Sequence, residues 1–214
     1  MTPRPPTRQA GPRDDGSAIV IALLATMLIA ALGQGLVLLA DTEQAIAANA
    51  HAGTEALYAA DAGIACVVSE LRRTTAWTGV LAGSLSSAFV DGTRTPRGPS
   101  GEIIDLNALT SALQASAAAT DPWGADNPSW RLYAYGPLAS FTGSPRDRAY
   151  VAVWVADDPA DGDGNPVVDS NRVLTLLATG FGPSRSVRRI QATVGAPAGG
   201  VQSRPRVVSW REVR

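Results

Sequence analysis

An unbroken apolar run constrains this chain more than any other feature of its sequence. Residues 17–40 read SAIVIALLATMLIAALGQGLVLLA, which is 24 residues without a charged side chain, and Gln34 is the only strongly polar residue among them. A helix needs about 20 apolar residues to cross the hydrocarbon core of a bilayer, so this run is long enough to span one. The sequence therefore predicts one transmembrane helix over residues 17–40.

The charges that flank this run predict its orientation. Arg4, Arg8 and Arg13 precede it, whereas Asp41 and Glu43 follow it. Because basic residues are retained on the cytoplasmic side of a membrane, we expect a cytoplasmic N-terminus. The rest of the chain is then expected outside the inner (cytoplasmic) membrane after a single pass.

The segment before the run, residues 1–16, is rich in Pro and Arg and has no apolar stretch, so we expect it to be disordered. A secretory signal would have an apolar region of about 7–15 residues and a cleavage site after it, and the run here is longer. A generic signal anchor fits the length of the run. A leader that is removed on the cytoplasmic side also fits and accounts for the charged segment.

Composition excludes several classes of function. The net charge is −1 and charged residues make up 17% of the chain, which argues against nucleic acid as the main partner. Cys66 is the only cysteine and His51 the only histidine, so neither an intramolecular disulfide nor a cysteine-rich metal site can form. No catalytic motif is present, and the sequence predicts a protein that is not an enzyme.

The residues after the apolar run continue its helical pattern. No proline occurs over residues 41–73, and apolar or small residues recur at steps of three and four, which predicts an amphipathic helix. Joined to the apolar run, this gives one helix over residues 17–73. The predicted buried stripe consists of Ile46, Ala50, Gly53, Leu57, Ala60, Ile64, Val67 and Leu71.

Residues 74–214 read as a globular domain. Gly and Pro mark residues 92–101 as a loop, and residues 106–119 favour a short helix. β-Branched and aromatic runs separated by turn residues predict strands over 129–135, 149–156, 172–179, 187–194 and 207–213. Short connections between successive strands favour an antiparallel sheet. We therefore expect an α+β fold in which this sheet packs against the long helix, with a core that begins at the aromatic residues Trp123, Trp130, Tyr133 and Tyr135.

An acidic loop between two predicted strands is a candidate metal site. Asp161, Asp163, Asn165 and Asp169 occupy positions 1, 3, 5 and 9 of an EF-hand-like spacing, and oxygen ligands suit Ca²⁺. Pro166 stands where an EF-hand has glycine, and Arg172 where it has glutamate. The same Asp-Gly and Gly-Asn pairs are also ordinary hairpin residues, so calcium binding and a plain acidic turn both remain open.

The junction before the apolar run resembles the class III signal of type IV pilins. RDDG at residues 13–16 is followed directly by SAIVIALL at residues 17–24, as in a basic leader that ends in glycine before an apolar helix. The resemblance implies that a prepilin peptidase cuts between Gly16 and Ser17, and that the new N-terminus is methylated. Major pilins carry glutamate five residues after the cut, where this chain has Ile21, and this difference indicates a minor pilin.

A second segment narrows the resemblance. ALYAADAGI at residues 56–64, followed by SEL at residues 69–71, resembles a segment of PilX-type pilus assembly proteins. The resemblance implies a pilin-like fold, and partners that include other pilins and the pilus assembly platform. It also implies lateral packing of helices through the membrane-spanning residues Ile19, Ile21, Leu24, Leu28, Gly33 and Gly35.

Three functions remain open on the sequence. The first is a minor pilin of a type IV pilus, and the second is a minor pseudopilin of type II secretion, which is built on the same leader and helix. The third is a single-pass, membrane-anchored binding or adhesion protein without a fibre. For Gly33 and Gly35, resemblance to pilins implies local unwinding in the fibre, whereas small residues also permit close packing of helices.

Overall fold

The computed structural model describes residues 15–120, 124–196 and 204–213. Most of the predicted leader and Trp123 therefore lie outside the described residues. The chain divides into two compact units, Met1–Ala48 and Asn49–Arg214. One helix, α1 (Asp15–Leu71), contributes to both units, and its bounds confirm the long helix predicted over residues 17–73 to within two residues at each end.

The described residues of the first unit all belong to α1. Every residue from Ser17 to Ala48 is exposed, although most of those up to Ala40 are apolar. Alanine and leucine favour the helical conformation, and the helix has no proline to interrupt it.

In the second unit α1 buries a broad face of small residues. Its buried face begins at Ala52 and includes Ala56, Ala59 and Ala60 at 3% exposure or less. The predicted stripe is therefore wrong at its start, because Ile46 and Ala50 are exposed, and it is too narrow further along. Small side chains let the helix approach the backbone of a sheet closely, a feature that apolar spacing alone does not specify.

The sheet has five antiparallel strands in sequential order, which confirms the predicted sheet. Its strands are β1 (Arg131–Pro137), β2 (Tyr150–Asp157), β3 (Val173–Phe181), β4 (Val187–Gly195) and β5 (Arg206–Val213). In the register, Tyr150 of β2 faces Phe181 of β3, and Phe181 faces Val187 of β4. These pairs lie at one end of the sheet, and the loop between β2 and β3 lies at the other.

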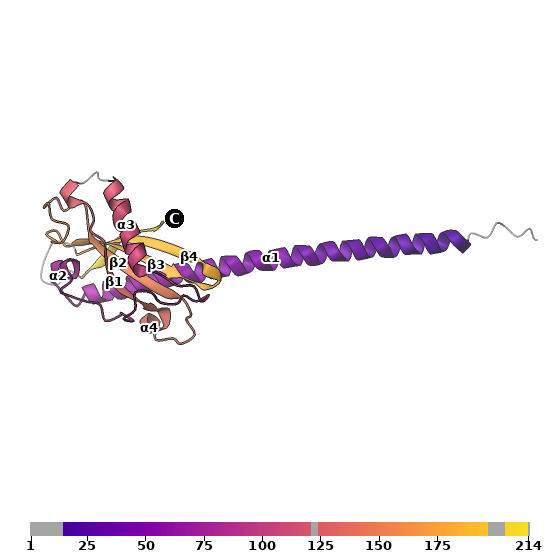
Figure 1. Ribbon diagram of the computed structural model, residues 1–214, viewed down its shortest axis with the longest axis horizontal. Helices are drawn as coiled ribbons and strands as arrows, with labels where there is room; N and C mark the ends of the chain where they lie inside the picture. Colours follow the sequence, from indigo (N-terminus) through magenta and orange to yellow (C-terminus); the bar gives the residue numbers. More distant parts are fainter. Residues whose placement is uncertain (1–14, 121–123, 197–203, 214) are drawn as a thin grey trace, which may run out of the picture. The chain divides into compact units, whose positions relative to one another are not determined.

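In the second unit, helices lie on both faces of the sheet, while β5 stays exposed along most of its length. On one face, α1 residues such as Ile64 and Val67 pack on Val153 of β2 and Leu176 of β3. On the other face lies α3 (Leu106–Thr120), whose first residue belongs to a cluster with Trp154 and Phe181. Figure 1 shows α3 in front of the strands and this part of α1 behind them. Because β2 is covered on both faces, all eight of its residues are buried and its sequence does not alternate.

Short elements complete the fold. They are α2 (Trp77–Ala82), α4 (Leu138–Thr142) and the 3₁₀ turns η1 (Gly124–Asp126) and η2 (Pro183–Arg185). The buried indole of Trp77 donates hydrogen bonds to the carbonyl oxygens of Leu71 at 3.3 Å and Thr74 at 3.2 Å. These carbonyl groups lie at and after the end of α1, where helical partners are no longer present.

Candidate functional site

The apolar surface of α1 in the first unit is the most extensive candidate site. The predicted packing residues Ile19, Ile21, Leu24 and Leu28 are between 61% and 65% exposed. Leaving one such side chain in water rather than burying it costs about 1.5–3 kcal/mol. Among the described residues, α1 is the one helix that is long and apolar enough to cross a membrane.

Two threonine hydroxyl groups, one within the apolar run and one just after it, are satisfied within the helix. The hydroxyl group of Thr26 donates to the carbonyl oxygen of Leu23 at 2.9 Å, and that of Thr42 donates to Leu38 at 2.8 Å. Such bonds back to the preceding turn remove the need for a water partner. The helix can therefore exchange water for lipid, or for a second apolar helix, without leaving these hydroxyl groups unpaired.

Gly33 and Gly35 lie within the same surface. A β-carbon added at either position would meet nothing within 4 Å. Contacts inside the described part of the chain therefore give no reason for glycine at these positions, although glycine costs about 1 kcal/mol relative to alanine in a helix.

The predicted processing site lies at the start of α1. The helix begins at Asp15, so the bond between Gly16 and Ser17 falls in its first turn. The first turn of a helix frays most easily, because its N–H groups lack helical partners. Unwinding this turn into an extended conformation therefore costs little free energy.

In the second unit, the acidic loop brings three carboxylates together. Oxygen atoms of Asp157, Asp161 and Asp163 all lie within 4.8 Å of one another. Asp157 ends β2 and is 2% exposed, and sequence analysis did not select it. Burial, and then the charge of Asp161, raises the pKa of Asp157 to about 7. A cation held by the three carboxylates would favour the ionised form of Asp157, and so would offset both the effect of burial and the repulsion from Asp161.

The other two predicted ligands have different roles. Asn165 Oδ1 accepts from the backbone N–H of Val167 at 3.3 Å. Asp169 Oδ1 accepts from the N–H groups of Arg172 at 2.7 Å and Val173 at 3.3 Å, which organises the start of β3. The structure thus groups Asp161 and Asp163 with Asp157, which precedes the loop. Asp169 lies outside this group of three.

Position in the sequence did carry a signal for Asp157. It follows the uncharged run YVAVWVA and immediately precedes the acidic loop, so the end of a buried strand delivers it to that loop. Three carboxylates supply hard oxygen ligands of the kind that Ca²⁺ prefers. Calcium binding therefore stays a prediction, now with Asp157 among the candidate ligands.

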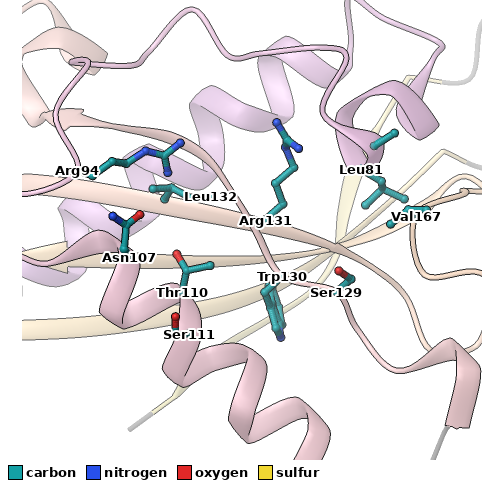
Figure 2. Close-up of a pocket in the computed structure, with 11 residues that line it drawn as sticks. Leu81, Arg94, Asn107, Thr110, Ser111, Ser129, Trp130, Arg131, Leu132 and Val167 are labelled. Atoms are coloured by element: carbon teal, nitrogen blue, oxygen red, sulfur yellow. The ribbon is translucent and has the colours of Figure 1, made fainter.

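A surface hollow of about 650 Å³ lies beside the start of β1. Figure 2 shows Asn107, Thr110 and Ser111 from α3 lining it, together with Arg94 and Arg131. The described residues that line it include no carboxylate, cysteine or histidine. They therefore offer hydrogen-bond donors and two positive charges, but no pair of a nucleophile and a general base.

Comparisons of the chain with models of protein families, with curated proteins and with solved structures gave no match.

Proposed function

We propose that this chain is a minor pilin-like subunit in type IV pilus assembly. Residues 17–40 anchor it in the inner membrane, a prepilin peptidase cuts between Gly16 and Ser17, and α1 then packs with the helices of other pilins. The globular part of the chain lies outside the cytoplasm. Its role in the fibre is priming, capping or adjustment rather than bulk construction.

The observation that carries this proposal is the division of α1 into two kinds of surface. Up to Ala40 the helix is apolar and exposed on all sides, whereas from Ala52 to Leu71 one face is buried under a sheet. A helix of this kind is fixed in its own domain at one end and free at the other. The free end can lie in lipid, and it can later exchange lipid for neighbouring helices at little cost, because both surroundings are apolar.

The residue at position 21 supports an accessory role. In major pilins a glutamate at this place is thought to pair with the N-terminus of a neighbouring subunit, and this chain has Ile21, which is 65% exposed. Without this charge pair, polymerisation has one fewer specific contact. A subunit present in few copies tolerates that loss better than a repeating one.

Mass spectrometry of the membrane-extracted protein tests the processing step. In a host with active prepilin peptidase, we expect a mature N-terminus at Ser17, and we expect Gly16→Glu to retain the whole leader. Gly11→Glu, an equal change within the leader, serves as the control and should still be processed. A wild-type chain that keeps Met1–Gly16 in this host would contradict the proposal.

Fractionation then tests the fibre itself. We expect a small amount of the processed chain to copurify with sheared pili and to disappear when the pilus assembly platform is deleted. Copurification with a type II secretion fibre instead would assign the chain to the pseudopilins. Processed chain found only in the membrane fraction would leave the anchored binding protein as the function.

A further inference from the structure

Arginines gather at the end of the sheet where β2 and β4 begin. Arg146 and Arg148 lie in the loop between α4 and β2, and Arg185 lies in η2 between β3 and β4. Arg188 and Arg189 follow at the start of β4. The pairing of Tyr150 with Phe181, and of Phe181 with Val187, places these loops at one end of the sheet. We name these five arginines the basic end.

Most of the charge at the basic end is not neutralised. Among the described residues the structure has one ion pair, between Arg188 Nε and Glu212 Oε1 at 3.5 Å. Asp147 is the other carboxylate in these segments, and one of its oxygen atoms accepts from the hydroxyl group of Thr142 at 2.6 Å. The adjoining loop adds Arg97, Glu102 and Asp105, and its two carboxylates line a hollow together with Arg185, so six arginines against four carboxylates leave an excess of two positive charges. Arg146, Arg148 and Arg185 are exposed and have no ion pair in the described part of the chain.

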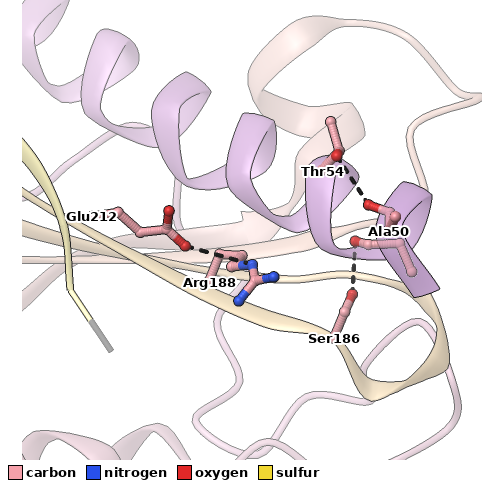
Figure 3. A network of polar contacts seen from close by, with 6 residues as sticks. Ala50, Thr54, Ser186, Arg188 and Glu212 are labelled. Carbon is pink, nitrogen blue, oxygen red and sulfur yellow. Dashed lines mark hydrogen bonds and ion pairs between the residues drawn. The ribbon is translucent and has the colours of Figure 1, made fainter. Parts of the chain in front are cut away.

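The basic end is bonded to the first residues of α1 in the second unit. The hydroxyl group of Ser186 donates to the carbonyl oxygen of Ala52 at 2.8 Å. A β-carbon added at Gly53 would lie 3.0 Å from the guanidinium group of Arg188. Figure 3 shows Ser186 and Arg188 of the β3–β4 segment beside this stretch of helix, with Glu212 on the neighbouring strand.

The length of the chain between these contacts and the predicted span is short. Ala52 follows Ala40, the last residue of the span, by twelve residues. As a helix these residues cover about 18 Å. The basic end is therefore tethered within a short chain length of the membrane surface. Electrostatic attraction between exposed charges acts over about 8–10 Å at physiological ionic strength.

Exposed apolar side chains accompany the arginines. Val187 is 44% exposed, and Ile103 is 68% exposed. The N–H group of Arg185 donates to Ser100 Oγ at 3.1 Å, which holds the loop that contains Ile103 against the basic end. Cationic side chains beside exposed aliphatic ones match the interface of a bilayer, where phosphate headgroups lie next to acyl chains.

We propose that the basic end binds the headgroups of anionic phospholipids in the membrane that holds residues 17–40. This inference rests on the proposed membrane anchoring, but not on the proposed fibre. Binding holds the second unit against the bilayer while α1 is inserted. Entry into a fibre then requires the basic end to exchange lipid headgroups for other partners.

Energy transfer from a dye on the domain to labelled lipid tests this binding on the full chain. In a Cys66→Ala background, Ser184→Cys gives a dye position at the basic end, and Thr75→Cys gives one near the end of α1. The chain is inserted into nanodiscs of phosphatidylcholine alone or with phosphatidylglycerol. We expect phosphatidylglycerol to raise transfer from position 184. Raising the salt from about 0.01 M to about 1 M should abolish that rise, because the Debye length falls from about 30 Å to about 3 Å.

Matched triple variants separate the basic end from total charge. R146E/R148E/R185E should lose the rise caused by phosphatidylglycerol. R73E/R204E/R206E changes the net charge by the same amount. It replaces exposed arginines at the other end of the sheet, where Arg206 pairs with Gly195, and it should keep the rise in transfer. Equal transfer in both lipids, or equal loss in both triple variants, would overturn the inference.

Three outcomes are distinguishable. A chain that does not float with the nanodiscs contradicts the membrane anchoring, and this inference falls with it. A chain that floats but shows no response to lipid charge contradicts this inference alone. Transfer that depends on the number of chains in a disc, and not on lipid charge, would show that the basic end contacts another copy and would also overturn it.

Discussion

Gly180 of β3 lies so close to the carbonyl oxygen of Ala56 in α1 that a β-carbon at position 180 would overlap it. Backbone, which cannot rotate away, fills the space, so Gly180→Ala must separate the strand from the helix. We expect this change to lower the free energy of unfolding by about 1–3 kcal/mol, a cost typical of overpacking in a tight core. Urea unfolding of the full chain in detergent, followed by tryptophan fluorescence, measures it.

Gly136 of β1 provides the matched control. A β-carbon there would lie 3.6 Å from a ring carbon of Phe141 and 3.8 Å from Cβ of Asp91, both ordinary contact distances. Gly136→Ala is expected to change the free energy of unfolding by less than about 1 kcal/mol. The added methyl group has room, and glycine itself does not stabilise a strand. Equal losses in the two variants would show that the helix does not approach β3 as closely as described.

The buried carboxyl group of Asp157 should make the protein less stable as the pH rises. Burial and Asp161 raise its pKa from 3.8 to about 7, so the folded state holds a proton that the unfolded state releases. Stability therefore falls between about pH 4 and pH 7, with a ceiling of about 4 kcal/mol set by the two pKa values. Asp157→Asn should remove this loss, and it keeps the oxygen that accepts from the N–H of Asp158 at 3.0 Å.

Unfolding of wild type and Asp157→Asn at pH 5 and pH 8, in the presence of a chelator, measures the effect. The variant should be more stable than wild type by about 1–3 kcal/mol at pH 8, and by a smaller amount at pH 5. Asp41→Asn, which removes an exposed carboxylate of α1, is the control and should leave the difference between the two pH values unchanged. A wild-type protein that is more stable at pH 8 than at pH 5 in the chelator would contradict the prediction.

Calcium should reverse this pH dependence if the three carboxylates bind it. Ligand carboxylates must be ionised, so added Ca²⁺ is expected to raise the melting temperature more at pH 8 than at pH 5. About 5 mM Ca²⁺ suffices, because extracellular calcium modules have dissociation constants up to about 10⁻³ M. The double variant D161N/D163N should lose the response, and Asp41→Asn should keep it. No shift in wild type at pH 8 leaves the loop as an acidic turn.

Much of this fold could be predicted from local patterns. The absence of proline and the apolar steps predicted α1, and β-branched runs between turn residues predicted all five strands to within about two residues. Sequential strands with short loops favoured the antiparallel order that the sheet has. These features depend on residues near one another in the chain, so local sequence is sufficient.

Features that depend on distant residues were missed. Ile46 and Ala50 continue the apolar spacing but are exposed, because the packed part of α1 starts at Ala52. Asp157 joins Asp161 and Asp163 only because β2 ends beside the acidic loop. The covering of the second sheet face by α3 is also a tertiary feature, and α2 and α4 are too short to produce a periodic signal.

Substitutions at the two glycines in the apolar half of α1 can distinguish two roles for these residues. Gly33 and Gly35 have open space around them, so Gly33→Ala and Gly35→Ala together should leave the second unit intact and stiffen the helix by about 1 kcal/mol per residue. If these glycines allow close packing with a neighbouring helix, alanine is small enough to be tolerated and leucine is not. If they allow local unwinding in the fibre, alanine already impairs incorporation.

We expect the packing result, since glycines two positions apart point to different sides of a helix and can each admit a neighbour. Incorporation into sheared fibres, measured by immunoblot against the membrane-bound pool, should survive G33A/G35A and fall at least about tenfold in G33L/G35L, which is a loss of about 1.4 kcal/mol. A30L/A31L adds similar bulk about one turn earlier, where the native residues already carry a β-carbon, and should have a smaller effect. Equal loss in the alanine and leucine pairs would contradict packing and assign these glycines to unwinding.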